Sequence, residues 1–334
     1  MTSERRELAR DGSHLNSGSP TARELCPAED GKLLVVGLRC GRLANRIVLF
    51  ANLIAFAAEH GHRVMNVTFH SYAHLFNATR RDIYCRYPAP ARRSVLDLIP
   101  GAARAIRKTR ILYQMARLAS VLNDRYSPFG DAAVTLRESR KRPFVLLNDP
   151  EIQDRIRNAR VVFIYGWGFS APDCVPRHAD RVREFFRPAE PHDQASRQMV
   201  ERLRQEADIV VGVHIRHGDY KDWNNGKCYF PISRYAAWMR ELAGQFSGRR
   251  VAFLVCSDQP RRRDEFPELQ VGFGTDVPVE DLYALARCDY VLGPISSFSQ
   301  WASFYGQKPL FHLDDPNARV DLDRFQVADL HKIL

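Results

Sequence analysis

The chain has 334 residues, enough for two domains that each bury a sizeable core. Its formal net charge of +10 favours an anionic partner: a nucleotide sugar, a phosphorylated lipid headgroup or a nucleic acid. No apolar run approaches membrane-spanning length, so we expect a soluble, cytoplasmic protein without a transmembrane segment. Seven cysteines are scattered without a CxxC pair or a nearby His cluster, which indicates reduced thiols.

The pattern along the chain predicts an α/β protein. Residues 1–30 are polar and rich in Gly, Ser and Pro, so we expect a disordered leader. Beyond them, β-like runs alternate with helical patterns, as in parallel βαβ units, and we expect Rossmann-like domains at 31–205 and 206–334. The expected strands are 33–38, 63–69, 144–147, 161–165, 209–215, 251–256 and 290–292, and the expected helices are 47–60, 102–122, 179–206, 279–288 and 298–305.

The stretch of about 90–140 is expected to be a basic helical insertion. Within the helix 102–122, apolar residues recur at helical spacing. This pattern favours a packed helix with a solvated basic face; an interfacial helix on anionic lipid, or a rim around an anionic acceptor, is the alternative. The basic residues are Arg92, Arg93, Arg104, Arg107, Lys108 and Arg110, and the apolar ones are Ile106, Leu112, Met115, Leu118 and Leu122.

A buried strand ends in charged residues within the segment 209–220. The run 209–215 is rich in β-branched residues, and Gly218 supplies a bend just beyond it. Because side chains alternate along a strand, His214 and Arg216 should leave one face of the sheet at its carboxyl end, where ligands of open α/β sheets bind. A guanidinium there can grip a diphosphate and stabilise the charge that develops as the diphosphate departs.

Asp219 is the candidate general base of this segment, since it lies three residues after Arg216. It could accept the proton of an acceptor hydroxyl, with Asp222 as the runner-up. The alternatives are that Asp219 only orients Arg216 or the acceptor, or that the two form a surface salt bridge.

Polar groups also follow two other expected strands. The loop 41–46 places Arg42 and Asn45 beside the start of a helix, whose free N–H groups attract anions, although a plain turn is equally compatible. Asp258 follows the strand 251–256, where it could meet donor hydroxyls or the base, or could cap a helix.

The block 280–306 contains a strand that ends at Gly293 and a helix that starts near Ser297 and Ser299. Hydroxyls and free N–H groups at such a start bind phosphate, and the same serines can cap the helix. Ligand groups at strand ends in both halves predict a cleft between two Rossmann-like domains, a GT-B-like architecture.

Two classes of ligand are not expected. No Asp-x-Asp sequence stands at a clear strand end where it would hold Mg²⁺ between donor phosphates, so no metal cofactor is expected. Basic residues are not interleaved with exposed aromatics on one face, so nucleic acid is not expected as a partner.

Taken together, these segments resemble the fucosyltransferase superfamily, most closely its α-1,2 group (glycosyltransferase family 11-like). The segment 41–46 (Gly-Arg-Leu-Ala-Asn-Arg) resembles the family loop Gly-Arg-Leu-Gly-Asn-Gln, and 214–220 (His-Ile-Arg-His-Gly-Asp-Tyr) is similar to the signature His-x-Arg-Arg-Gly-Asp-Tyr. The segment 166–170 resembles the aromatic strand end before the second domain. The segment 297–302 resembles Thr-Phe-Ser-Trp-Trp-Ala, with Glu280-Asp281-Leu282-Tyr283 at the expected distance before it.

The resemblance implies an inverting, metal-independent transfer of fucose from GDP-fucose to a glycan hydroxyl, in α-1,2 linkage to a galactose-like residue. The N-terminal domain would hold the acceptor and the C-terminal domain would hold GDP-fucose. Arg216 would grip the β-phosphate, His214 would contact the donor and Asp281 would take the guanine N–H groups. The other donor-binding residues implied are Arg42, Asn45, Asp258, Ser297, Phe298 and Ser299, with the serines around the diphosphate.

Three positions depart from the family pattern. His217 replaces the second arginine of the signature and carries no permanent charge, so we expect weaker or pH-dependent donor affinity. Ala44 and Arg46 should narrow or re-charge the entrance. The alternative function is a non-catalytic nucleotide-sugar or glycan-binding protein with the same fold, and peripheral contact with an anionic membrane surface is a further candidate interaction.

Overall fold

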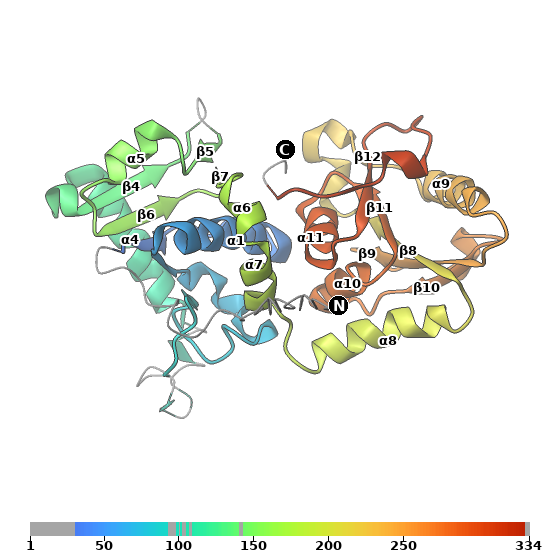
Figure 1. Cartoon of the computed structure of the whole chain (residues 1–334), viewed down its shortest axis with the longest axis horizontal. Helices are drawn as coiled ribbons and strands as arrows, with labels where there is room; N and C mark the ends of the chain where they lie inside the picture. The colour runs from blue at the N-terminus through green and yellow to red at the C-terminus, as the bar shows by residue number, and fades with distance from the viewer. Residues whose placement is uncertain are drawn as a thin grey trace, which may run out of the picture.

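The computed structural model describes residues 31–330 apart from 93–97, 100, 102–104, 107–108 and 140–142. The expected leader and most of the basic cluster before Arg110 lie outside the described residues. The rest forms two α/β halves, each built around its own sheet, that lie side by side (Figure 1). This confirms the expected α/β class with two parallel sheets.

The sheet of the first half has the strand order β3-β2-β1-β6-β4, parallel except for β3. Because β2 and β6 flank β1, the chain crosses from one side of β1 to the other, which makes the carboxyl end of β1 a topological switch point. A separate parallel pair joins β5 to β7. The strands are β1 (Leu33–Val36), β2 (Arg63–Met65), β3 (Arg86–Tyr87), β4 (Ala133–Arg137), β5 (Val145–Leu146), β6 (Val161–Tyr165) and β7 (Phe169–Ser170).

The sheet of the second half has the order β10-β9-β8-β11-β12-β13, parallel except for β13. All seven residues of β8 are buried, as expected for the central strand of a sheet covered on both faces. Its switch point lies between β8 and β11. The strands are β8 (Ile209–Ile215), β9 (Val251–Ser257), β10 (Gln270–Phe273), β11 (Tyr290–Pro294), β12 (Pro309–Leu313) and β13 (Gln326–Val327).

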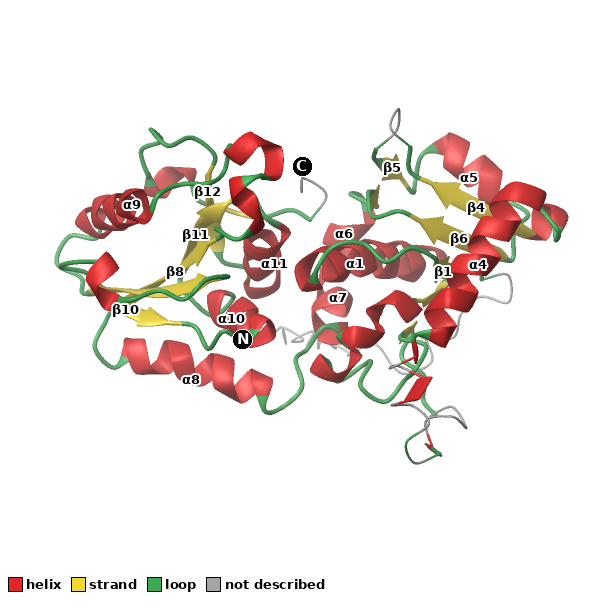
Figure 2. Ribbon diagram, turned by 180° about the vertical axis from the view of Figure 1, so that it is seen from behind, coloured by secondary structure: helices red, strands yellow, loops and turns green. Residues whose placement is uncertain are grey.

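Helices pack around both sheets (Figure 2). Capping residues define several helix ends. Gly61, with φ 66°, ends α1. At the starts of α5 and α11, the side chains of Asp149 and Ser296 accept backbone N–H groups. No described helix is long and apolar enough to cross a membrane. The helices are α1 (Leu43–His60), α4 (Ile111–Tyr126), α5 (Pro150–Ile156), α6 (Cys174–Arg177), α7 (Ala179–Phe185), α8 (His192–Arg204), α9 (Ile232–Gln245), α10 (Pro278–Leu285) and α11 (Ser297–Gly306).

A continuous hydrophobic core joins the two halves. Helix α1 is buried along most of its length and packs against α6, α7 and α11. At the junction, the ring of Phe186 meets those of Phe50 and Trp301 nearly at right angles, with centroids 5.6 and 5.2 Å away, and the Tyr283 hydroxyl donates to the Phe186 carbonyl. This packing holds the ends of the two sheets against each other.

Several expected elements differ in extent. The helix expected over 179–206 is two helices, α7 and α8, because Pro188 and Pro191 interrupt it. The strand expected over 63–69 ends at Met65, and a 3-10 helix follows at Val67–Ser71. Helix α1 begins at Leu43, so most of the expected loop 41–46 is helical. The strands β4, β10 and β12 and the helix α9 were not expected.

The face of α4 that packs on the sheet is not the apolar face expected for the helix over 102–122. Ala116, Ser120 and Asn123 are its buried residues, whereas Met115 and Leu118 are 60% and 58% exposed. Small side chains are required on the inner face because it approaches the β1 end closely: a Cβ on Gly37 would lie 2.6 Å from the Ser120 hydroxyl. The helical spacing of the apolar residues is confirmed, but the expectation that Met115, Leu118 and Leu122 face the core is wrong.

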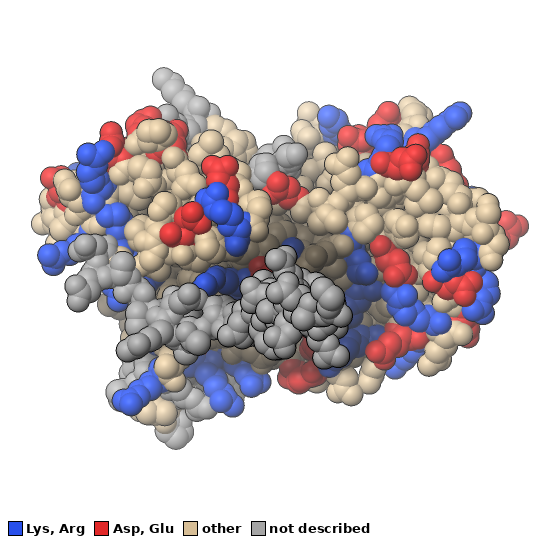
Figure 3. Space-filling model, viewed as in Figure 1, with Lys and Arg blue, Asp and Glu red and all other residues tan. Residues whose placement is uncertain are grey.

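The charge of the described surface is mixed. Acidic and basic side chains are interspersed over both halves on the face shown in Figure 3, and the six described cysteines form no disulfide with one another.

Candidate functional site

A cavity of about 800 Å³ lies where the two halves meet, in the size range of small-molecule sites. It collects residues that follow the carboxyl ends of β1, β6, β8, β9 and β11, so both switch points open onto one space. The first half contributes Gly41, Arg42, Leu43, Ala44, Asn45, Tyr72 and Trp167. The second half contributes His214, Arg216, Asp219, Tyr220, Trp223, Cys256, Ser257, Asp258, Gln259, Pro260, Asp276, Pro278, Asp281, Ile295, Ser296, Ser297 and Phe298.

Two helices, one from each half, begin at this cavity. The Ser296 side chain caps α11, whereas Arg42 at the start of α1 makes no side-chain cap. The Ser297 hydroxyl donates to the Asn45 side-chain carbonyl and joins the two helix starts. Since the first N–H groups of a helix and its dipole favour negative charge, the two N-termini together make an anion site.

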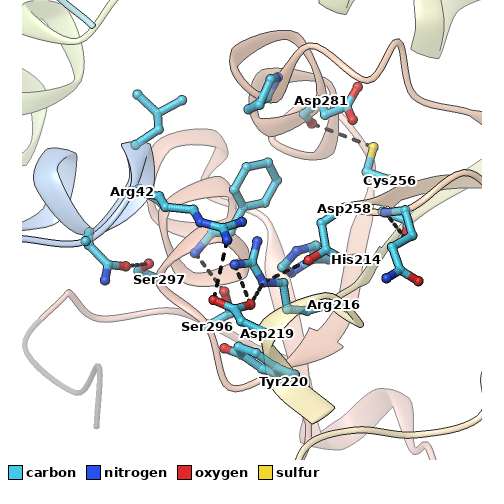
Figure 4. Close-up of a pocket in the computed structure, with 18 of the residues that line it drawn as sticks. Arg42, His214, Arg216, Asp219, Tyr220, Cys256, Asp258, Asp281, Ser296 and Ser297 are labelled. Atoms are coloured by element: carbon cyan, nitrogen blue, oxygen red, sulfur yellow. Dashed lines mark hydrogen bonds and ion pairs between the residues drawn. The ribbon is translucent and has the colours of Figure 1, made fainter. Parts of the chain in front are cut away.

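Arg216 lies at the centre of the charged wall (Figure 4). Its Nε and Nη2 donate to Asp219 Oδ1 at 2.8 and 2.7 Å, and its Nε lies 3.3 Å from Asp258 Oδ2. Arg42 reaches Asp219 Oδ2 from the first half at 3.8 Å. Two guanidinium groups from different halves therefore converge on the same carboxylate at the cavity wall.

Asp258 holds the turn after β8. Its Oδ1 accepts the backbone N–H groups of His217 and Gly218 at 2.8 and 3.2 Å. Burial raises the pKa of Asp258, but these two N–H groups and the Arg216 guanidinium outweigh burial and bring it below its ordinary value. A Cβ on Gly218 would lie 2.6 Å from Asp258 Oδ2, so only glycine allows this approach.

His214 is a buried, neutral histidine with one ring face on the cavity wall. Burial, with the Arg216 charge nearby, lowers the pKa of His214 to about 3. Its ring stacks on Phe298 at 4.7 Å, and its Nδ1 lies 2.8 Å from the Ser299 hydroxyl. Ser299 thus departs from the expected diphosphate role: it is fully buried behind His214 and orients that ring instead of lining the cavity.

His217 also differs from expectation. It is buried away from the cavity, its Nε2 lies 2.6 Å from the Phe230 carbonyl, and its Nδ1 accepts from Arg261 Nη2 at 2.9 Å. Burial lowers the pKa of His217, which keeps the ring neutral. The replacement of the signature arginine therefore changes the packing behind the turn and not the charge of the cavity wall.

The expected effect of Arg46 on the entrance is wrong for the same reason. Arg46 is 5% exposed, and its guanidinium donates to the carbonyls of Gly41 and Thr68 at 3.0 Å. It also lies over the Tyr72 ring at 5.1 Å. Arg46 fixes the loop before α1 from inside and adds no charge to the cavity.

Asp281 stands at the opposite end of the labelled residues from Tyr220 (Figure 4). It is 5% exposed, and its Oδ1 accepts the Thr275 backbone N–H at 2.8 Å. Burial, together with the nearby Asp276 and Glu280 carboxylates, raises the pKa of Asp281 to about 6. A buried carboxyl of this kind gains its charge easily when a ligand brings N–H donors.

Of the expected site residues, Arg42, Asn45, His214, Arg216, Asp219, Asp258, Asp281, Ser297 and Phe298 line this cavity, and Asp222 does not. Sequence reasoning missed the aromatic residues Tyr72 and Trp223 and the helix cap Ser296. The Ser-Ser pair before the helix carried the signal for Ser296. Nothing in the sequence indicates Tyr72 and Trp223: Tyr72 lies between two short 3-10 segments and Trp223 begins another, and none of these has a clear periodicity.

Part of the chain is similar to known proteins. Residues 169–318 match the model of glycosyl transferase family 11. This match confirms the resemblance to the fucosyltransferase superfamily over these residues, from the end of the first half through most of the second. Nodulation protein Z of Azorhizobium caulinodans is 28% identical over 144 residues, which cover 33% of this chain and 44% of that protein, so the match spans less than half the length of this relative.

The fold is also shared with a solved structure. A mutant of Arabidopsis thaliana FUT1 in complex with GDP superposes with a TM-score of 0.54 at 11% identity, covering 89% of this chain and 73% of that one. Fucosyltransferase NodZ from Bradyrhizobium gives a TM-score of 0.47 at 14% identity, covering 86% and 97%. The FUT1 likeness supports the GT-B-like fold expected from the sequence.

Gly218→Ala tests the turn that carries Arg216. The added Cβ displaces the Asp258 carboxylate, so we expect a loss of about 1–3 kcal/mol in the free energy of unfolding, measured by urea denaturation. The control is Gly244→Ala, where nothing lies within 4 Å of the new Cβ inside α9 and the substitution should stabilise. Equal effects of the two substitutions would contradict the close approach at Gly218.

Proposed function

We propose that this chain is an inverting fucosyltransferase that moves fucose from GDP-fucose to a glycan hydroxyl without a metal ion. The observation that carries the proposal is the anion site at the junction of the halves: two helix N-termini with Arg216 and Arg42. A nucleoside diphosphate is the ligand class that such a site favours. The family 11 match over 169–318 supports fucose as the transferred sugar.

The donor is proposed to lie along the wall of the second half. Its diphosphate would contact the start of α11 at Ser297 and the Arg216 guanidinium, and its guanine N–H groups would donate to Asp281. A guanine offers two adjacent N–H donors, which pair well with the two oxygens of a carboxylate. Asp281 is buried at the far end of the cavity from Tyr220, which leaves the Tyr220 end for the sugar and the acceptor.

In the proposed reaction an acceptor oxygen bonds to the fucose anomeric carbon from the face opposite the diphosphate. The bond from that carbon to the β-phosphate oxygen breaks, its electron pair leaves with GDP, and the acceptor hydroxyl gives its proton to solvent water. Arg216 stabilises the charge that develops on the leaving phosphate. Arg42 and the first N–H groups of α11 can add to this stabilisation.

The geometry favours an orienting role for Asp219 over that of general base. Arg216 donates two hydrogen bonds to one of its oxygens, and Arg42 lies near the other. Both oxygens of this carboxylate therefore face guanidinium groups and not an acceptor hydroxyl. Asp219 is accordingly proposed to place Arg216 for the donor.

The direct test is transfer and GDP release from GDP-fucose in the presence of EDTA, with galactose-terminated acceptors. NodZ is described as an α-1,6-fucosyltransferase, so both α-1,2 and α-1,6 linkages are assayed, and α-1,2 to a galactose-like residue is the expected product. Arg216→Ala should lower kcat/KM by about 10²–10³ because it removes a charge that stabilises the transition state. The exposed Arg262→Ala is the matched control and should have no effect.

Three outcomes would count against parts of this proposal. Donor binding without turnover would favour the non-catalytic alternative, and equal affinity for GDP-fucose, GDP-mannose and UDP-sugars would reject the donor assignment. Asp219→Asn should weaken donor binding together with kcat. A fall in kcat of about 10²–10⁴ at unchanged donor affinity would make Asp219 the general base instead.

Donor affinity should depend on pH through Asp281. Guanine N–H groups bind the charged carboxylate, so affinity is complete above the free pKa of about 6 and falls by up to about tenfold per pH unit below it. Calorimetric titration with GDP-fucose between about pH 5 and 7.5 measures this effect. Asp281→Asn should flatten the profile, whereas the exposed Asp264→Asn should not; identical profiles in all three proteins would contradict the assignment.

An aromatic platform marks the end proposed for the acceptor. The rings of Tyr220 and Trp223 stack at 4.9 Å, and Trp223 keeps 45% of its surface exposed at the cavity rim. The next three residues, Asn224, Asn225 and Gly226, all have positive φ. Asparagine and glycine adopt this left-handed conformation readily, so the run forms a turn directly after Trp223, and the stacking on Tyr220 sets the place of the indole. An exposed, fixed indole is suited to stacking on a sugar ring.

Trp223→Ala should raise the acceptor KM about tenfold, because the loss of one aromatic face removes one stacking contact, while GDP-fucose affinity stays unchanged. Trp223→Phe should restore most of the acceptor affinity. Steady-state kinetics with each substrate varied in turn separates the two effects. Phe144→Ala, an exposed aromatic outside the cavity, is the control; a loss confined to donor binding would contradict the platform.

A further inference from the structure

In an ordinary surface helix the large apolar side chains face the core, but in α4 several of them face the solvent and small or polar residues face the sheet. Its buried residues, Ala116, Ser120 and Asn123, are small or polar. Asn123 donates to the Ala133 carbonyl at 3.1 Å, and Thr135 donates to the Ser120 carbonyl at 3.1 Å, so hydrogen bonds as well as packing fix this face against β4. This face, with the half-buried Leu112 and Tyr113 at its edges, therefore fixes the orientation of the helix.

Those large side chains form a stripe on the opposite side. Each is between 41% and 65% exposed, and their positions, four, three, four and four residues apart, lie on one line along the helix. The stripe consists of Ile111, Met115, Leu118, Leu122 and Tyr126, and the exposed Phe129 follows directly after the helix. Contiguous exposed apolar surface of this kind marks an interaction site.

The charges beside the stripe are positive. Arg110, Arg117 and Arg125 are exposed. On the helical wheel Arg125 borders the stripe beside Leu118 and Arg117 lies further round the same side, while Arg110 immediately precedes the helix. The single acidic residue of the helix, Asp124, is paired with Arg137 at 2.8 Å. Among the described residues none forms an ion pair with these arginines, and an apolar stripe with positive charge beside it and aromatic residues at its end matches the boundary between anionic headgroups and acyl chains.

We propose that α4 docks this protein peripherally on an anionic lipid surface. The apolar stripe would enter the acyl boundary, and Arg110, Arg117 and Arg125 would pair with headgroup phosphates. The charge complementarity selects this occupant, since a second copy of the chain would bring the same arginines against one another. Helix α4 lies on the outer side of the first half (Figure 2), none of its residues lines the cavity, and the proposal is independent of the proposed transferase activity.

Flotation with vesicles tests this proposal on the full chain. The protein should float with vesicles that mix phosphatidylcholine and phosphatidylglycerol, and added salt should release it. Met115→Gln with Leu118→Gln should lower the partition coefficient at least about tenfold, because two apolar side chains no longer gain from burial. Arg117→Gln with Arg125→Gln should lower it by about fivefold per arginine and remove the preference for the anionic lipid.

Matched controls keep the result interpretable. Leu146→Gln and Val327→Gln replace side chains that are 48% and 49% exposed off the stripe, and they should float like the unmodified chain. All substitutions lie on the surface, so circular dichroism and thermal melting should show an unchanged fold. The proposal is wrong if the unmodified protein does not float with anionic vesicles, if the stripe variants float equally well, or if the stripe instead holds a concentration-dependent dimer that the Gln variants dissociate.

Discussion

The candidate site depends on one carboxylate at the sheet edge, whose side chain is 15% exposed. Asp258 accepts the N–H groups of His217 and Gly218 and lies beside the Arg216 guanidinium, so it fixes both the turn after β8 and the cation that the turn presents. Its charge persists because these donors outweigh the cost of burial. The close approach explains the glycine at 218, and the bent turn places Arg216 and Asp219 at the sheet edge, where they meet Arg42 of the other half.

The second requirement is that two separate sheet edges face one cavity. Each half has a switch point at the carboxyl end of its central strand, and the core around α1, Phe186 and Trp301 holds the two edges together. The bond from Ser297 to Asn45 links the two helix starts directly. Because neither half alone surrounds an anion, the charged site exists only at the junction, and the relative placement of the halves controls it.

Residues that are close together in the sequence have different roles, because some line the cavity and others are buried behind it. His214 and His217 are three residues apart and both neutral, yet His214 forms the cavity wall and His217 supports the turn from behind. Ser297 links the helix starts, whereas Ser299 orients the His214 ring. A motif therefore contains two layers, the residues that meet the ligand and those that position them, and only the burial of each side chain separates the layers.

The sequence by itself determined the α/β class, the central strand over 209–215, the helix start near Ser297 and the polar residues at the strand ends, because these follow from local periodicity and capping chemistry. It did not determine which face of a helix is covered. The spacing of Met115, Leu118 and Leu122 is the same whether the stripe is buried or exposed, and small residues opposite it decided the outcome through the tight packing at Gly37. Likewise, the arginine at 46 and the histidine at 217 look like site residues until long-range packing buries them. The tertiary structure decided these points because burial is set by contacts between segments far apart in the chain.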